Sequence, residues 1–168
     1  MIFCRGGLKM LIIQAVLICF LLTAIVKIAV GNDAVNGAYF YPKEIQQRLI
    51  ELGRTDQKTI DRKRKICMTS FYVVLPVAML LIIGWWNGVS DFRTAYLQAL
   101  LFLEVMNWYD GFIIDKLWVG CSKFWKIPGT EDLPFVQSWG QMFKKRGILT
   151  VIWVAGAALM AGLVVLIF

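Results

Sequence analysis

The sequence predicts an all-α integral membrane protein with four transmembrane helices and amphipathic interfacial helices in two cytoplasmic loops. Three observations predict this class. Hydrophobic residues make up 59% of the 168 residues and the mean hydropathy is +0.66, whereas soluble domains are about 45–50% apolar. The apolar residues gather in four long runs. The lysines and arginines gather in two segments between those runs.

The four apolar runs cover about residues 10–30, 71–89, 94–114 and 148–168. Each approaches the roughly 20 residues that a helix needs to cross a hydrocarbon core of about 30 Å. A chain inside the bilayer must satisfy its backbone hydrogen bonds internally, so each run is expected to be helical. The first run is longer than the apolar core of a signal peptide. We therefore expect residues 1–168 to form a single membrane domain.

The positive charges predict how the chain is oriented. Fifteen of the 18 Lys and Arg residues lie in or beside two loops, about residues 31–70 and 115–147. Loops rich in Lys and Arg stay on the cytoplasmic side of a membrane. Both loops are therefore expected inside the cell, and both termini outside it.

Each cytoplasmic loop contains a helical pattern. In the first loop, Pro42 is suited to begin a short helix whose apolar residues recur until Gly53. Thr55 is expected to cap a second short helix that leads into residues 62–65. In the second loop, apolar residues between 135 and 143 fall on one face. This pattern predicts a helix that lies in the membrane interface.

The basic cluster of the first loop is a candidate lipid contact. Four consecutive cations on the cytoplasmic side attract anionic headgroups, although their effect on topology alone also explains them. Aromatic residues are not interleaved with these cations, so a nucleic-acid partner is not expected. The cluster consists of Arg62, Lys63, Arg64 and Lys65.

The third apolar run contains polar residues that are costly in lipid. Glu104 lies near its middle, where a carboxylate costs about 2.5–3.5 kcal/mol on insertion scales. At α-helical spacing, Glu104, Asn107 and Asp115 share one side of the helix. We interpret this stripe as a polar path or pocket. The alternative is a set of interhelical hydrogen bonds that fix the packing.

Asp110 is expected to point away from this stripe, because α-helical spacing places it on another side. Lys27 should lie at the same cytoplasmic end of the membrane, so Asp110 and Lys27 are a candidate pair at the inner interface. Snorkelling of Lys27 to the headgroups explains that lysine equally well.

The remaining composition limits the chemistry. The chain has no histidine, and its four cysteines do not have the spacing of metal ligands. We expect free thiols, no metal site and no cofactor. The cysteines are Cys4, Cys19, Cys67 and Cys121.

Three functions fit these residues. The first is a transport-related or membrane-assembly component that works as a homo-oligomer or beside a membrane protein partner. Ala158 and Gly162 allow a close helix approach, either to another helix of this chain, which is the default interpretation, or across such an interface. The second is a metal-dependent enzyme in which Asp110 and Asp115 act on a lipid or phosphate headgroup. The third is a non-catalytic membrane anchor for a partner protein, and no residue is assigned a catalytic role.

Four segments carry a resemblance to a known family. Together they resemble an uncharacterised family of small bacterial four-helix integral membrane proteins, sometimes labelled as transporter permeases. The resemblance implies a bacterial cytoplasmic membrane and brings no established activity. Members of that family often have a histidine where this chain has Ser122. The segments are Tyr41–Gln46, Asn107–Asp110, Ile114–Trp118 and Ile127–Asp132.

Overall fold

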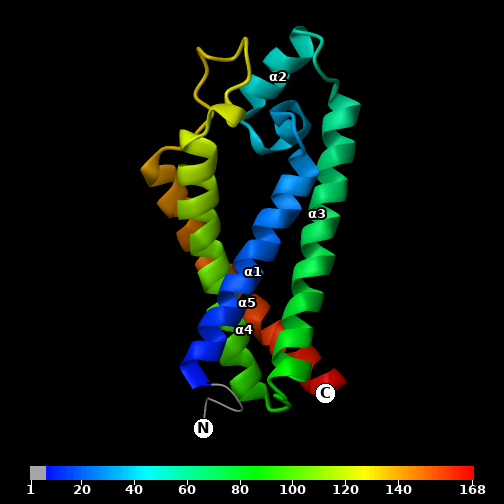
Figure 1. Cartoon of the computed structure of the whole chain (residues 1–168), viewed down its shortest axis with the longest axis vertical. Helices are drawn as coiled ribbons and strands as arrows, with labels where there is room; N and C mark the ends of the chain where they lie inside the picture. Colours follow the sequence, from blue (N-terminus) through cyan, green and yellow to red (C-terminus); the bar gives the residue numbers. More distant parts are fainter. Residues whose placement is uncertain (1–6) are drawn as a thin grey trace.

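The computed structural model describes residues 7–168, and within them every regular element is a helix (Figure 1). The long helices run along the molecule, and the short elements gather at the end where α2 lies. In chain order the elements are α1 (Gly7–Val30), η1 (Ala34–Phe40), α2 (Lys43–Glu51), α3 (Gln57–Leu80), η2 (Leu81–Trp86), α4 (Phe92–Tyr109), η3 (Asp110–Val119), η4 (Lys123–Trp125) and α5 (Trp139–Ile167).

Within residues 7–168, three helices are long and apolar enough to cross a membrane, as expected for a membrane protein. They are Gly7–Val30, Gln57–Trp86 and Trp139–Ile167. The expected third crossing, residues 94–114, falls on α4 and the π-helical segment η3 that continues it. Together α4 and η3 form one rod, which runs beside the other long helices in Figure 1. Polar residues along it, including Gln98 and Glu104, make it less apolar than the other three.

Two of the long helices begin earlier than the apolar runs predict. α3 starts at Gln57, capped by the Asp56 carboxylate, which accepts from the Thr59 N–H at 2.6 Å. It continues through the basic cluster without a break. α5 starts at Trp139 behind a capping box of Ser138 and Gln141. The second helix expected in the first loop, and the helix expected in the second loop, are therefore the first turns of α3 and α5.

The short helix of the first loop forms as predicted. α2 covers Lys43–Glu51 directly after Pro42, and it ends before Gly53, whose φ is +66°. The Arg54 N–H reaches back to the Leu49 carbonyl at 3.0 Å. Glycine adopts this left-handed conformation without the cost that a side chain brings, so it ends the helix here.

The tightest helix pair is α4 with α5. Small residues allow the two backbones to approach closely, and in lipid such packing drives helix association. Gly162 does not serve this contact, because it is exposed on α5 and an added side chain there would meet open space, and Ala158 is only half-buried. The fully buried alanines of the pair are Ala95 and Ala99 on α4, and Ala157 and Ala161 on α5.

A buried amide cluster joins three segments at the end of the bundle where η2 leads into α4. Asn87 exchanges two hydrogen bonds with Gln14 of α1, at 2.6 and 3.1 Å. The Asn87 side chain also donates to Gln98 of α4 at 2.8 Å. All three side chains are buried. Because each amide would otherwise be unpaired in an apolar region, the cluster fixes α1, the turn and α4 in register.

At the opposite end, the two loops pack together as one cap, formed by residues 31–56 and 120–138. Tyr41 and Trp125 are at its centre, and the Tyr41 hydroxyl donates to the Trp125 carbonyl at 2.8 Å. Burial raises the pKa of Tyr41 above its ordinary range, so it remains a neutral donor. An exposed ion pair between Arg48 and Asp132 also joins the two loops.

The amide cluster generates a stability prediction. Asn87→Ala removes the central amide and leaves Gln14 and Gln98 buried without their partner. We expect a loss of roughly 1–3 kcal/mol in unfolding free energy, measured by SDS titration in mixed micelles. Ser90→Ala, at an exposed position of the same turn, is the control and should be neutral. An Asn87→Ala protein as stable as the parent would contradict a structural role for the cluster.

Candidate functional site: a groove between α3 and α5

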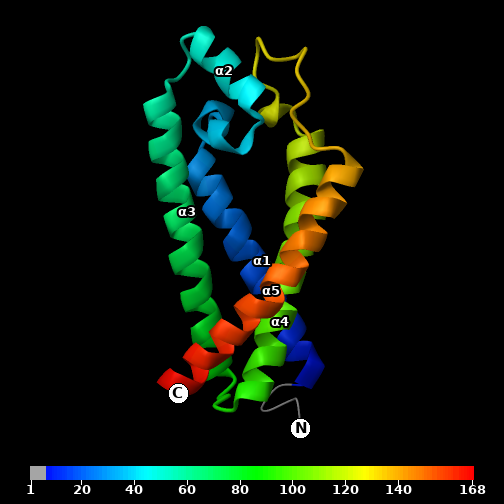
Figure 2. The same cartoon turned by 180° about the vertical axis from the view of Figure 1, so that it is seen from behind.

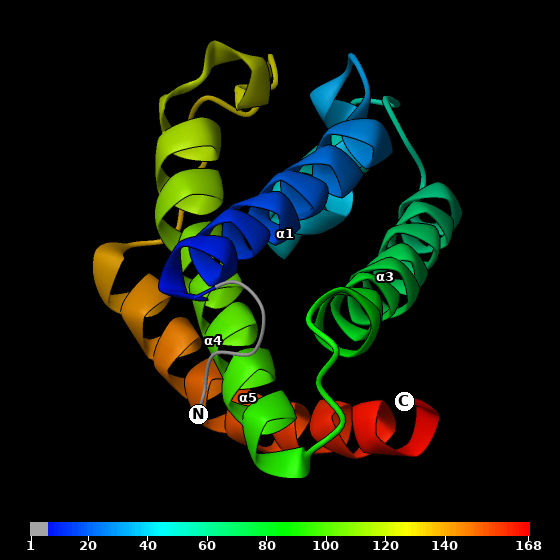
Figure 3. The ribbon, with the colours of Figure 1, turned by 60° about the horizontal axis from the view of Figure 1, so that its bottom comes forward.

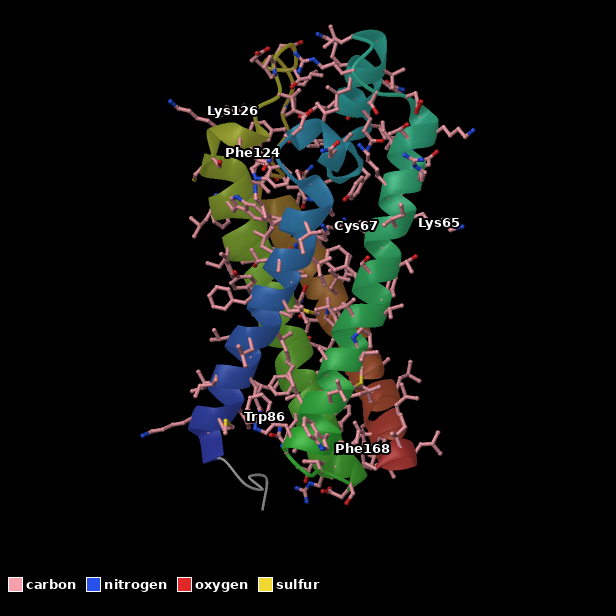
Figure 4. All side chains as sticks on the ribbon, turned by 45° about the vertical axis from the view of Figure 1, so that its right-hand side comes forward. Lys65, Cys67, Trp86, Phe124, Lys126 and Phe168 are labelled. Atoms are coloured by element: carbon pink, nitrogen blue, oxygen red, sulfur yellow. The ribbon has the colours of Figure 1, made fainter. Side chains whose placement is uncertain are left out.

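A cavity of about 720 Å³ lies between α3 and α5 and is called the groove below. The two helices converge near the end of the chain and diverge toward the cap, with α1 behind them (Figure 2). Viewed from that end, α5 passes beneath the end of α3 (Figure 3). There the Phe168 ring packs directly against Gly84, which has no side chain to hold it off. The side-chain view places Trp86 and Phe168 at this same end (Figure 4).

Most of the groove is apolar. Its walls come from α1, α3, α5 and the helix formed by α4 and η3. The cap residues Tyr41 and Trp125 line its end nearest the cap. A space of this size is within the range of about 300–1,000 Å³ that is typical of ligand sites. The apolar wall residues include Leu22 on α1, Leu75 and Met79 on α3, Leu103 on α4, and Leu149 and Met160 on α5.

One end of the groove carries a charged triad of Asp110, Asp115 and Arg146. Arg146 is on α5, and its side chain is only 3% exposed. Its Nη1 lies 2.6 Å from Asp110, and its Nη2 lies 2.6 Å from Asp115. One guanidinium thus connects two carboxylates on the neighbouring rod. Such charge-assisted bonds are about twice as strong as neutral ones.

The π-helical geometry of η3 explains why both carboxylates reach one arginine. Hydrogen bonds from residue i to i+5 place Asp115 on the same side of the helix as Asp110, a little more than one turn further along. The expectation that Asp110 points away from the stripe is therefore wrong, because it assumed α-helical spacing. Gly111 completes the arrangement. A side chain there would come within 2.9 Å of the Arg146 Nε.

The rest of the polar stripe lies beside the triad at the α4–α5 contact. The Asn107 amide donates to the Arg146 carbonyl at 3.1 Å and to the Thr150 hydroxyl at 3.3 Å. That hydroxyl in turn donates to Glu104 at 2.7 Å. The structure therefore brings Glu104, Asn107 and Asp115 together. One acceptor of Glu104 and one of Asn107 are buried without a partner.

Lys27 does not join this site, which corrects the expected pair with Asp110. Its ammonium donates to the Gly31 carbonyl at 3.0 Å and stands over the Phe124 ring at 4.9 Å. A cation at the end of a helix pairs favourably with the last carbonyls. Lys27 therefore caps α1, and Arg146 takes the role of counter-ion to Asp110.

The basic cluster lies on the first turns of α3, away from the groove lining. Lys63 is partly buried and donates to the Asn36 amide oxygen at 2.6 Å. Arg62, Arg64 and Lys65 are exposed, and Lys65 points outward in Figure 4. Three cations of this cluster thus remain available to a lipid surface.

The cysteines differ in exposure. Cys19 and Cys67 are buried and Cys121 is exposed, all as free thiols, and Cys4 lies outside the described residues. Burial suppresses thiol reactivity, so Cys121 is the accessible thiol among these three.

The sequence reasoning missed Arg146, because the charge pattern counts it only among the cations of the second loop. A signal was present. Met142, Arg146 and Thr150 recur at intervals of four, which places them on one face of a helix. Met142 and Arg146 are buried there against the rod formed by α4 and η3.

Comparison with models of known protein families, with curated proteins and with solved structures finds no match for this chain.

The triad generates a second stability prediction. Arg146→Met leaves both carboxylates without their counter-ion, which should cost about 3–5 kcal/mol of unfolding free energy. The triple variant Arg146→Met, Asp110→Asn, Asp115→Asn removes the charges together and should recover most of that loss. Both are measured by SDS titration, with Lys144→Gln on the exposed surface as control. A triple variant no more stable than Arg146→Met would show that packing, and not charge, holds this contact.

Proposed function

We propose that this chain is a transport-related or membrane-assembly component that holds one amphipathic, lipid-like molecule in the groove. The observation that carries the proposal is the groove itself, a space of about 720 Å³ that is apolar along most of its length and charged at one end. A molecule with a hydrocarbon tail and a polar head has the same division.

The position of the groove supports entry from the side. It opens between α3 and α5, two helices that could cross a membrane. In that setting the opening faces lipid, so a tail can enter from the bilayer without crossing water. A tail in the groove would lie against half-buried wall residues such as Phe71 and Trp153.

The charges favour a ligand pocket over a metal-dependent reaction. Each carboxylate of the triad already uses one oxygen on Arg146 at 2.6 Å. That guanidinium neutralises one of their two negative charges, so a divalent cation would meet less charge there than two free carboxylates offer. We therefore favour recognition of a polar group by the triad over catalysis by Asp110 and Asp115.

The proposal includes the setting of the protein. We place it in a bacterial cytoplasmic membrane with four crossings and with both termini outside. The third crossing in chain order is formed by α4 and η3. The cap and the exposed cations Arg62, Arg64 and Lys65 then lie on the cytoplasmic side, against anionic headgroups. The small residues Ala158 and Gly162 form a contact surface for a second copy or a membrane protein partner.

Filling the groove should displace its ligand. Leu149→Trp places a large ring inside the groove, whereas Val151→Trp places the same ring on the outer surface of α5, where the residue is 72% exposed. We expect the first variant to lose most of the lipid that co-purifies with the parent, and the second to retain it, by native mass spectrometry. Equal lipid retention in the two variants would contradict a groove-bound ligand.

The orientation is tested with a thiol reagent that does not cross membranes. In a Cys4→Ser background, Cys121 should react only after the cells are opened, because this exposed thiol belongs to the cap, which we place on the cytoplasmic side. With Cys121 also replaced by serine, Ser90→Cys should react in intact cells, provided that the outer membrane admits the reagent. Labelling of both sites from the same side would remove α4 and η3 as a crossing.

A further inference from the structure

The charged triad carries an unbalanced charge. Two carboxylates surround one guanidinium, so Asp110, Asp115 and Arg146 together leave one negative charge at the end of an apolar groove. Buried charges are costly unless they are paired. The Asp110 and Asp115 side chains are 32% and 27% exposed, so each still offers oxygen to a group in the groove. The site therefore favours a second cation.

A third acceptor lies beside these carboxylates. Asn107 lines the same end of the groove, is 2% exposed, and has an Oδ1 without a partner. Its orientation is fixed, because its Nδ2 donates to the Arg146 carbonyl, which can only accept. A buried amide oxygen left unpaired costs about 1–3 kcal/mol. The Oδ1 itself has almost no accessible surface, so the groove lining must open slightly there before a ligand can donate to it and remove this cost.

These acceptors match a primary ammonium group. An ammonium has three N–H donors and no acceptor, and the site presents oxygens of Asn107, Asp110 and Asp115. Lys145 also lines the groove. Within the described residues it has no ion pair with a carboxylate. It can meet a phosphate that is joined to the ammonium by a short linker.

We infer that the groove selects a phospholipid whose headgroup carries a primary amine. The ammonium pairs with the triad and Asn107, the phosphate faces Lys145, and one hydrocarbon tail lies along the apolar wall. This inference rests on the proposed function and adds the chemical class of the ligand. The apolar wall distinguishes such a lipid from a free amine, because a soluble amine would leave that wall in contact with water.

The inference is tested by competition among headgroups on one set of acyl chains. The delipidated full-length protein is mixed with equal amounts of phosphatidylethanolamine, its N,N-dimethyl derivative, phosphatidylcholine and phosphatidylglycerol, and bound lipid is counted by native mass spectrometry. Methylation keeps the positive charge and lowers the number of N–H donors from three to one and then to none. We expect occupancy to fall along the methylated series, by about tenfold from the primary amine to the choline lipid. Phosphatidylglycerol should bind no better than phosphatidylcholine.

Variants separate the two ends of the headgroup. Asp110→Asn leaves a neutral pair of Asp115 and Arg146, so the preference for the primary amine should fall to about twofold or less while tail binding remains. Lys145→Gln should weaken all three lipids with a nitrogen headgroup alike and leave their ratio unchanged. Lys144→Gln is the exposed control and should change neither quantity. Should Asp110→Asn fail to fold, the methylated series on the parent protein still tests the preference for a primary amine, and Lys145→Gln still tests the phosphate contact.

The outcomes are distinct. Equal occupancy by all four lipids, or a preference for phosphatidylglycerol, would overturn the headgroup inference and leave the groove as a lipid site. Displacement of bound lipid by soluble ethanolamine alone would also overturn it, because the amine would then suffice without a tail. If no lipid binds the delipidated protein, both the inference and the proposed function fail.

Discussion

The rest of the site depends on the pairing of Arg146 with Asp110 and Asp115. An arginine buried in a membrane domain is costly unless it is neutralised, and here two carboxylates from the next rod do so at 2.6 Å. The pairing fixes the face of α5 that meets α4, and so the positions of Thr150 and Asn107. It also requires the π-helical geometry of η3, because in an α-helix residues 110 and 115 would not point the same way.

The groove follows from an uneven distribution of packing. α4 and α5 are held closely by buried alanines such as Ala99 and Ala161, by the triad and by the Glu104–Thr150 hydrogen bond. α3 instead packs mainly against α1, and it meets α5 near the end of the chain, where Gly84 contacts Phe168, and the cap at its start through Ile60. Between these two contacts α3 and α5 separate, and the space contains the apolar wall and the triad. The cap closes the space above the triad, so the charged end is covered while the side remains open.

Much of this arrangement could be predicted from the sequence. Apolar runs identified the membrane class, and Pro42 and Gly53 correctly bracketed α2. The polar stripe on residues 104–115 lies on the helix, α4 with η3, that carries half of the candidate site. What could not be predicted depends on local helix geometry and on contacts between residues far apart in the chain. The direction of Asp110 depends on a π-helix that periodicity does not reveal, and the partner of that carboxylate is Arg146, 36 residues away and not Lys27. The amide cluster of Gln14, Asn87 and Gln98 also joins segments far apart in the chain, and each residue alone looked like an interruption of an apolar run.

The most direct test of the account is photo-crosslinking with a phospholipid that carries a diazirine at the end of one acyl chain, followed by mass spectrometry of the labelled residues. The account predicts labelling of half-buried groove residues such as Phe71 and Trp153, and loss of this labelling in Leu149→Trp. Bulk lipid alone would label outward residues such as Val73 and Leu159, which are 54% and 74% exposed. Labelling confined to those outward positions would contradict the account, because the groove would then hold no lipid tail.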